Sequence, residues 1–286
     1  MKLPAFDYAA PQTLDEAIEL LATHDEALPL SGGQSLLPIL AFRLAAPSLL
    51  VDLRRIPGLD QINMSARGVE LGARVRWCDI EADARLLTAH PLLAEAVTHV
   101  AHYPIRSRGT VGGSLAHADT AAELPGIAMT CDAEIIAVGR NGKRSIAASD
   151  FFVGPMMTCL AHDELVTELR LPPWPSARRW AFEEFARQHG AFALAGIALY
   201  YDLCDGVATN VHIGVIGASA ALQRLTPAEA LLEGRLVDAA AMLETAQATA
   251  AAIDAADDID APAEYRRALV ETLTGRALQR AVTRPH

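Results

Sequence analysis

Hydrophobic and polar positions follow two periods along this chain, and together they predict a mixed α+β fold. Apolar residues at helical spacing come directly after 13–16 (Thr-Leu-Asp-Glu), a capping box with Thr13 as the N-cap and Glu16 reaching back, so a first helix is expected there. Helical patterns also cover 39–44, 83–87, 92–102, 126–130, 236–252 and 263–281. Alternating or continuous apolar runs predict strands over 28–30, 49–53, 61–65, 69–71, 133–138, 144–147, 164–171, 181–187, 192–201 and 206–216.

A proline-rich break divides these elements into two groups. The run 172–175 (Pro-Pro-Trp-Pro) predicts a boundary between residues 1–174 and residues 175–286. In the second region, three strands predict a small antiparallel sheet on which the alanine-rich helices pack. The residues 226–229 (Thr-Pro-Ala-Glu) match a second capping box, in which Thr226 is expected to be the N-cap, Pro227 the first helical residue and Glu229 the side chain that reaches back.

Charge and cysteine content exclude several classes of protein. The 286 residues include 24 Lys and Arg against 35 Asp and Glu, a net charge of −11, which argues against nucleic acid or an anionic membrane surface as a partner. No apolar signal region or membrane-length run occurs, so a cytoplasmic protein without membrane insertion is expected. The four cysteines lie far apart, which disfavours a disulfide framework, a zinc site or an iron–sulfur cluster within this chain.

Two glycine-containing segments carry the candidate chemistry. The first, 31–35 (Ser-Gly-Gly-Gln-Ser), follows an apolar strand and is expected to lead into a helix. The second, 105–125, contains Gly109, the pair 112–113 and several hydroxyl side chains, and is expected to be a loop. Glycine allows positive φ angles and close approach of a ligand to the backbone amides, and the nearby arginines Arg106 and Arg108 favour an anion.

A tight structural turn is the alternative explanation for each Gly-Gly pair. The occurrence of two such segments favours a ligand that is gripped from two sides, and a dinucleotide with a central pyrophosphate has this form. Neither segment has the third glycine of the dinucleotide fingerprint or the Gly-Lys-Ser/Thr ending of a P-loop, which disfavours a single-domain Rossmann or P-loop protein.

The two segments together resemble the flavin-binding loops of a known family. The sequences SGGQSLLP and IRSRGTVGGSLAHADTAAELP are similar to those of the FAD subunits of molybdenum hydroxylases, the xanthine dehydrogenase family, with medium subunits of the carbon monoxide dehydrogenase and quinoline 2-oxidoreductase type most alike. The likeness extends over essentially the whole chain. It implies a two-part FAD-binding domain of the PCMH type in 1–174, with units of approximately 1–56 and 57–174, and a flavoprotein C-terminal domain in 175–286.

The resemblance also implies a function and a set of partners. This chain would bind FAD, accept electrons from two [2Fe–2S] clusters on a small subunit, and pass them to an external acceptor. A large subunit would hold the molybdopterin cofactor and oxidise the substrate, and the complex is expected to be a dimer of heterotrimers. The alternative is a stand-alone flavin oxidase or reductase of similar fold, which needs its own acid–base residue.

The resemblance assigns FAD contacts to nineteen residues. They are Leu30, Ser31, Gly32, Gly33, Gln34, Ser35, Leu36, His102, Gly109, Thr110, Val111, Gly112, Gly113, Ser114, His117, Asp119, Glu123, Leu165 and Val166. The amides of 31–36 and 110–114 would hold the pyrophosphate. No catalytic residue and no metal ligand is expected in this chain.

Several of these assignments have an ordinary structural alternative. Glu123 stands where the family usually has an aspartate on the ribose or adenine end, but it could be a surface carboxylate, and Val166 could be a core residue. His102 could lie beside the flavin or serve a helix terminus. The family often has Lys at the position of Glu184 and Asp at that of Ala191, so ring contacts from these positions are expected to differ here.

Overall fold

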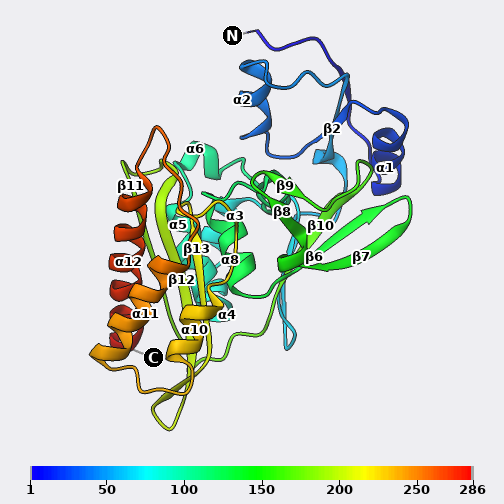
Figure 1. Cartoon of the computed structure of the whole chain (residues 1–286). Coiled ribbons are helices and arrows are strands. Elements are labelled where there is room, and N and C mark those ends of the chain that lie inside the picture. The colour runs from blue at the N-terminus through cyan, green and yellow to red at the C-terminus, as the bar shows by residue number, and fades with distance from the viewer. Residues whose placement is uncertain (1, 285–286) are drawn as a thin grey trace.

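The chain begins with a small parallel sheet that is framed by two helices. The computed structural model describes residues 2–284. Strands β1 (Asp7–Ala9), β3 (Leu49–Asp52) and β2 (Ala27–Leu30) pair in that order, with α1 (Leu14–Thr23) between β1 and β2 and α2 (Leu36–Ala41) after β2 (Figure 1). The Thr13 hydroxyl accepts from the Glu16 amide at 3.2 Å, which confirms the predicted N-cap, while the Glu16 carboxylate accepts from the amide of Gln12 rather than of Thr13.

A five-stranded antiparallel sheet forms the second layer. Its strands are β4 (Ile62–Ser65), β5 (Gly68–Gly72), β10 (Leu165–Leu171), β6 (Glu134–Gly139) and β7 (Gly142–Ala147), in that spatial order. Gly142, at φ 98°, makes the β6–β7 hairpin turn that the Asn-Gly pair predicts. Although β10 comes last of these strands in sequence, it is the central strand of the sheet, because it pairs with both β5 and β6.

Short helices fill the sequence between β5 and β10. They are α3 (Trp77–Ala82), α4 (Leu86–Ala89), α5 (Pro91–His99), α6 (Tyr103–Arg106), α7 (Val111–His117), α8 (Glu123–Thr130) and α9 (Ala148–Phe151), with the hairpin β8 (Phe152–Gly154) and β9 (Met157–Thr158), and the short 3₁₀ helix η1 (Leu53–Arg55) precedes β4. The helix expected over 92–102 ends at His99, and the helix expected over 83–87 lies later, at α4. Buried His90 lies between α4 and α5. Its ring nitrogen accepts a hydrogen bond from the Leu93 amide at 3.2 Å, so His90 caps the N-terminus of α5 and separates it from α4.

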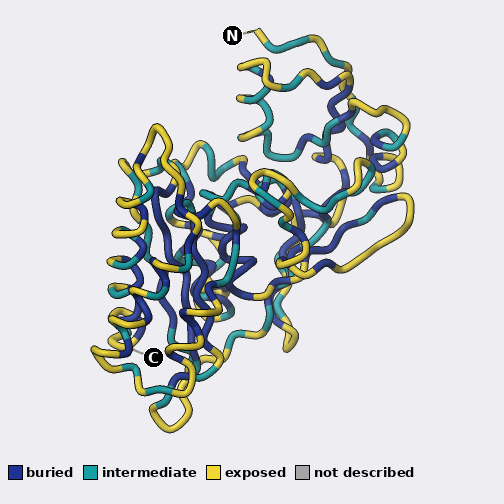
Figure 2. The backbone as a smooth tube through the Cα atoms, in the orientation of Figure 1, coloured by how far each residue is buried: buried dark blue, intermediate teal, exposed yellow. Residues whose placement is uncertain are grey.

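The last sheet lies between two layers of helices. Strands β11 (Arg179–Ala186), β12 (Ala193–Cys204) and β13 (Val207–Ile216) carry α10 (Thr226–Leu232), α11 (Ala239–Ala252) and α12 (Ala263–Thr283) on one face. The other face packs on α5 and α8. Successive side chains along each strand point to opposite faces of the sheet, so both faces are apolar. Phe182 and Tyr200 belong to the core of the preceding region, while Ala181 and Tyr201 belong to the core under the C-terminal helices. Figure 2 shows these buried strands beneath the more exposed helices.

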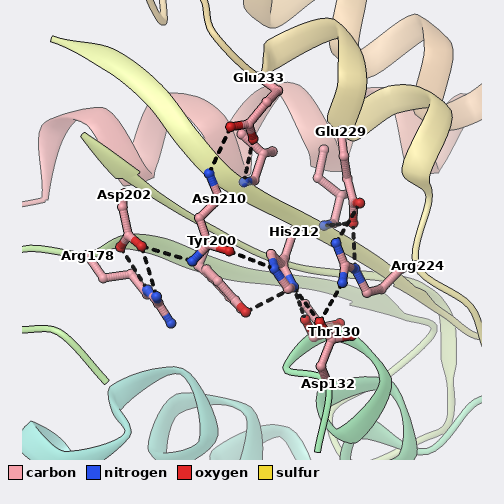
Figure 3. A network of polar contacts seen from close by, with 12 residues as sticks. Thr130, Asp132, Arg178, Tyr200, Asp202, Asn210, His212, Arg224, Glu229 and Glu233 are labelled. Atoms are coloured by element: carbon pink, nitrogen blue, oxygen red, sulfur yellow. Dashed lines mark hydrogen bonds and ion pairs between the residues drawn. The ribbon is translucent and has the colours of Figure 1, made fainter. Parts of the chain in front are cut away.

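A buried polar network fastens this sheet to α8. His212 on β13 bonds through Nδ1 to the Thr130 carbonyl oxygen at 2.8 Å and lies 2.9 Å from the Tyr200 hydroxyl, as Figure 3 shows. Its other ring nitrogen lies 3.1 Å from Asn210 Oδ1. These bonds satisfy polar groups that would otherwise be buried without partners, so the sheet has one preferred position on the helix.

The start of α10 differs from the sequence expectation. Thr226 is the first helical residue rather than the cap, and Leu225 occupies the N-cap position without a side-chain hydrogen bond. Glu229 does not reach back to the cap: its carboxylate accepts from the Ile213 amide at 2.8 Å and pairs with Arg224 (Figure 3). A buried strand amide and an arginine therefore outcompete the local capping box.

Two further findings bear on the sequence expectations. Within residues 2–284, no helix combines the length and apolar character needed to cross a membrane. The final two residues of the predicted C-terminal region lie outside the described residues.

Candidate functional site

The first glycine-containing segment presents unpaired backbone donors. Residues 31–35 connect β2 to α2, and Gly33 takes φ 72°, a left-handed conformation that favours glycine. Within the described residues of the chain, the amides of Gly32, Gly33, Gln34 and Ser35 have no hydrogen-bond acceptor, and all four residues line a cavity. Such a row of free amides is suited to an anion.

The second segment is a helix rather than the expected loop. α7 begins at Val111 with Thr110 as its N-cap, and its glycines lie in the first turn at ordinary helical angles. Glycine is required there for packing, because a Cβ on Gly112 would lie 2.6 Å from the Cβ of Ala73. The threonine and the following apolar residues supply an N-cap signal that the glycine content obscured.

The two segments contact each other directly. A hydrogen bond of 3.0 Å joins the hydroxyls of Ser31 and Thr110, which lie 79 positions apart. A Cβ on Gly32 would lie 2.2 Å from the carbonyl oxygen of Arg108. Gly32 is therefore required for close approach of one segment to the other, and the prediction that both face one ligand gains a geometric basis.

The amides of the second segment are largely engaged within the protein, which corrects one expectation. Val111 donates to the Val75 carbonyl at 2.9 Å and Gly112 to the Ala73 carbonyl at 2.7 Å, while Ser114 donates to the Thr110 carbonyl at 3.0 Å. Gly113 donates to the Thr110 hydroxyl at 3.3 Å. These amides fix α7 against the second sheet, so the side chains of this segment, rather than its backbone, are what it offers to the cavity.

The expected arginine contribution is also wrong. Arg106 pairs with Glu81 at 2.9 Å and donates to the carbonyls of Val100 and Ala101, each at 2.9 Å. Neither Arg106 nor Arg108 lines the cavity. Arg106 instead closes the turn between α5 and α6.

The cavity between the two segments has a volume of about 710 Å³, within the range of about 300–1,000 Å³ that is usual for cofactor pockets. Seventeen of the nineteen predicted residues line it. The two exceptions, Leu30 and Val111, are buried in the core. Each is adjacent in sequence to a residue that does line the cavity, Ser31 and Gly112 respectively. Leu165 and Val166 at the start of β10 belong to the wall.

Sequence reasoning missed most of the apolar wall. The additional lining residues include Leu28, Pro29, Ile39, Leu53, Trp77, Ile105, Leu160, Glu164 and Gly190. Trp77 packs closely against the second segment, since a Cβ on Gly109 would lie 2.6 Å from its indole nitrogen. Phe192 lines the cavity and is 68% exposed, whereas Glu184 does not line it.

Glu123 is a buried carboxyl in the cavity wall rather than a surface group. It is the first residue of α8 and is only 8% exposed. Burial raises the pKa of Glu123 to about 7, and the negative charge of Asp119 acts in the same direction. The side chain can therefore accept hydrogen bonds from, or exchange a proton with, a group in the cavity.

These features satisfy the main requirements of a bound FAD. The four unpaired amides suit a pyrophosphate, Glu123 and Asp119 suit ribose hydroxyls, and the apolar wall suits a flavin ring. Among residues 2–284, no three His, Cys, Asp or Glu side chains gather as metal ligands.

Comparison with known proteins places the chain in a family. Residues 4–174 match the family described as FAD binding domain in molybdopterin dehydrogenase, and residues 180–281 match the CO dehydrogenase flavoprotein C-terminal domain. The medium subunit of nicotine 6-hydroxylase from Paenarthrobacter nicotinovorans is 38% identical over 99% of this chain and 100% of its own. The carbon monoxide dehydrogenase medium chain of Hydrogenophaga pseudoflava is 32% identical over 98% of each.

Solved structures have the same fold over their full length. A carbon monoxide dehydrogenase from Hydrogenophaga pseudoflava has a TM-score of 0.97 and 33% identity, covering 100% of both chains. Quinoline 2-oxidoreductase from Pseudomonas putida 86 has a TM-score of 0.94 and 35% identity, covering 98% of both. The chain therefore belongs to the FAD-binding medium subunits of the molybdenum hydroxylase family.

Proposed function

We propose that this chain is the electron-transfer flavoprotein of a three-subunit molybdenum hydroxylase. FAD, when bound, supplies the redox chemistry, and this chain binds and orients it. Electrons reach the flavin from the [2Fe–2S] clusters of a small partner subunit and leave to an external acceptor. A large partner subunit holds the molybdopterin cofactor and determines the substrate, and two such heterotrimers associate in the cytoplasm.

The observation that carries this proposal is the paired arrangement at the cavity. The free amides of 32–35 hold the pyrophosphate, and the hydroxyls of Thr110 and Ser114 reach it from α7. Glu123 and Asp119 receive the ribose hydroxyls, with His117 beside them. His102, Leu165 and Val166 border the flavin ring, and Phe192 covers it from the β11–β12 loop.

We also propose that the chain divides functionally at the run 172–175, into an FAD-binding region (residues 1–174) and a C-terminal region (residues 175–286). The first region would consist of two smaller units, residues 1–56 and 57–174 approximately, which is supported by their separate parallel and antiparallel sheets. The cavity lies mainly between these units, and of the described residues beyond the boundary only those of the β11–β12 loop add to it.

Absorption spectra and metal analysis test this function. The chain purified alone is expected to show a flavin spectrum without iron or molybdenum, and co-purification with its partners is expected to add both metals. Flavin bleaching in the complex should then require the small subunit. A chain that turns over a small substrate by itself would instead support the stand-alone oxidase, and a colourless chain that rejects FAD within its complex would refute both.

A further inference from the structure

A third segment of the chain, residues 75–77, lies against the second glycine-containing segment at the cavity wall. Arg76 forms an antiparallel bridge with Thr110. The Trp77 amide donates to the Gly109 carbonyl oxygen at 3.3 Å. These backbone contacts place the first residue of α3, Trp77, directly beside the residues that begin α7.

The indole ring of Trp77 is buried and borders the cavity. The residue is only 4% exposed and belongs to the cavity wall. Its pyrrole edge packs on Gly109, since a Cβ on this glycine would lie 2.6 Å from Nε1 and 2.9 Å from Cδ1. Gly109 in turn approaches Gly32 of the first segment, because a Cβ on Gly32 would lie 3.0 Å from the Gly109 Cα. The indole nitrogen therefore lies next to the contact between the two glycine-containing segments.

The N–H group of this indole is a donor without a partner. Within residues 2–284, Trp77 Nε1 has no hydrogen-bond acceptor, and it is not one of the polar atoms that are sealed in the core without a partner. Because the ring is otherwise buried, the nitrogen is accessible from the cavity that the residue lines. An indole nitrogen can only donate, and nearly all polar groups inside proteins have a partner. A free donor at this place indicates an acceptor on the ligand of the cavity.

The charge of the cavity wall indicates which part of the ligand needs this donor. None of the described Lys or Arg residues lines the cavity, whereas Asp119, Glu123 and Glu164 do. A pyrophosphate in such a cavity is stabilised by N–H dipoles rather than by cationic side chains, so each free donor near it counts. The amides of 32–35 supply four such donors, and the Trp77 indole is adjacent to them through Gly109.

We propose that Trp77 is a further cofactor-binding residue, whose indole N–H donates to a pyrophosphate oxygen of FAD beside the free amides of 32–35. This inference rests on the proposed flavin function and adds a third segment of the chain to the site. It also gives Gly109 a different role from the one the sequence suggested. The Gly109 amide is already engaged, donating to the Ile105 carbonyl oxygen at 2.7 Å, so this glycine serves the site by leaving room for the indole ring.

Nitrogen-15 NMR of the indole N–H groups tests this donor without requiring activity. The chain has three tryptophans, and Trp77→Phe identifies the signal of interest. In the flavin-free wild type, this signal is expected to move downfield on addition of FAD or ADP, which carry a pyrophosphate, and to stay in place with adenosine, which carries none. Trp174 and Trp180 are internal controls, because neither lines the cavity. An unmoved Trp77 signal in the FAD-loaded chain would overturn the proposal, and an equal shift with adenosine would overturn the assignment to the pyrophosphate.

An isosteric replacement measures what the N–H contributes to affinity. Benzothienylalanine at position 77 keeps the shape of the bicyclic ring but has sulfur in place of the N–H, so the packing on Gly109 is retained. The FAD dissociation constant is expected to rise about 10–100-fold, as for a lost hydrogen bond to a charged group. The same replacement at Trp180, which is also buried, should leave it unchanged. Equal affinity in the wild type and the position-77 variant would overturn the proposal, whereas a wild type that does not bind FAD would refute the proposed function instead.

Discussion

Gly32→Ala is the substitution that most directly tests how the two segments form the cavity. The new methyl group would lie 2.2 Å from the Arg108 carbonyl oxygen, 2.9 Å from its carbon and 3.0 Å from the Gly109 Cα. All three are backbone atoms, so no side chain can rotate away. The two segments must separate by roughly 1 Å to restore van der Waals contact.

This separation has two calculable costs. Overpacking of a tight backbone contact typically costs about 1–3 kcal/mol. The Ser31–Thr110 hydrogen bond, at 3.0 Å, lengthens beyond useful range, which costs about 1 kcal/mol. We therefore expect the free energy of unfolding to fall by about 2–4 kcal/mol and the FAD dissociation constant to rise about 10–100-fold, equivalent to about 1.4–2.8 kcal/mol.

Fluorescence titration with FAD and denaturant unfolding measure the two effects. Gly275→Ala provides a matched control, because among the described residues outside its own turn of α12 no atom lies within 4 Å of a Cβ at this position. The same chemical change should there stabilise the protein by about 0.5–1 kcal/mol and leave FAD affinity unchanged. If Gly32→Ala bound FAD as tightly as the wild type, the close contact of the two segments would not be what shapes the cavity.

Three further substitutions test buried polar groups outside the cavity. Arg266→Leu removes the donor to the Leu194 and Gly217 carbonyls, at 2.8 and 2.7 Å, and should lower the free energy of unfolding by about 2–4 kcal/mol in urea denaturation; an unchanged midpoint would contradict this. Glu229→Gln keeps an acceptor for the Ile213 amide but loses the charge that pairs with Arg224, so thermal unfolding should reveal a loss of about 1–2 kcal/mol. Burial lowers the pKa of His90 to about 3, so the unfolded chain binds one more proton between pH 6.5 and 3, and stability falls as pH decreases through that window. His90→Gln should remove this contribution, about 1.4 kcal/mol per pH unit, and unfolding curves with the same slope in both proteins would refute it.

The sequence determined the elements whose causes are local. The N-cap at Thr13, the hairpin turn at Gly142 and the alternation along β11–β13 were all readable, because each depends on residues a few positions apart. The glycine-containing segments were also readable as motifs, and they led to the correct family and to 17 of the 33 residues that line the cavity. Helix α7 was not predicted from the sequence, because its two glycines suggested a loop and obscured the ordinary N-cap at Thr110.

Only the tertiary structure decided the contacts between residues that are distant in sequence. It joined Ser31 to Thr110, diverted Glu229 from its local cap to a strand amide, and turned Arg106 toward Glu81. It also made Glu123 a buried carboxyl. None of these contacts could be read from spacing, because partners distant in sequence are selected by packing and by the cost of leaving buried polar groups unpaired, whereas turns and caps are fixed by short-range sterics and hydrogen bonds.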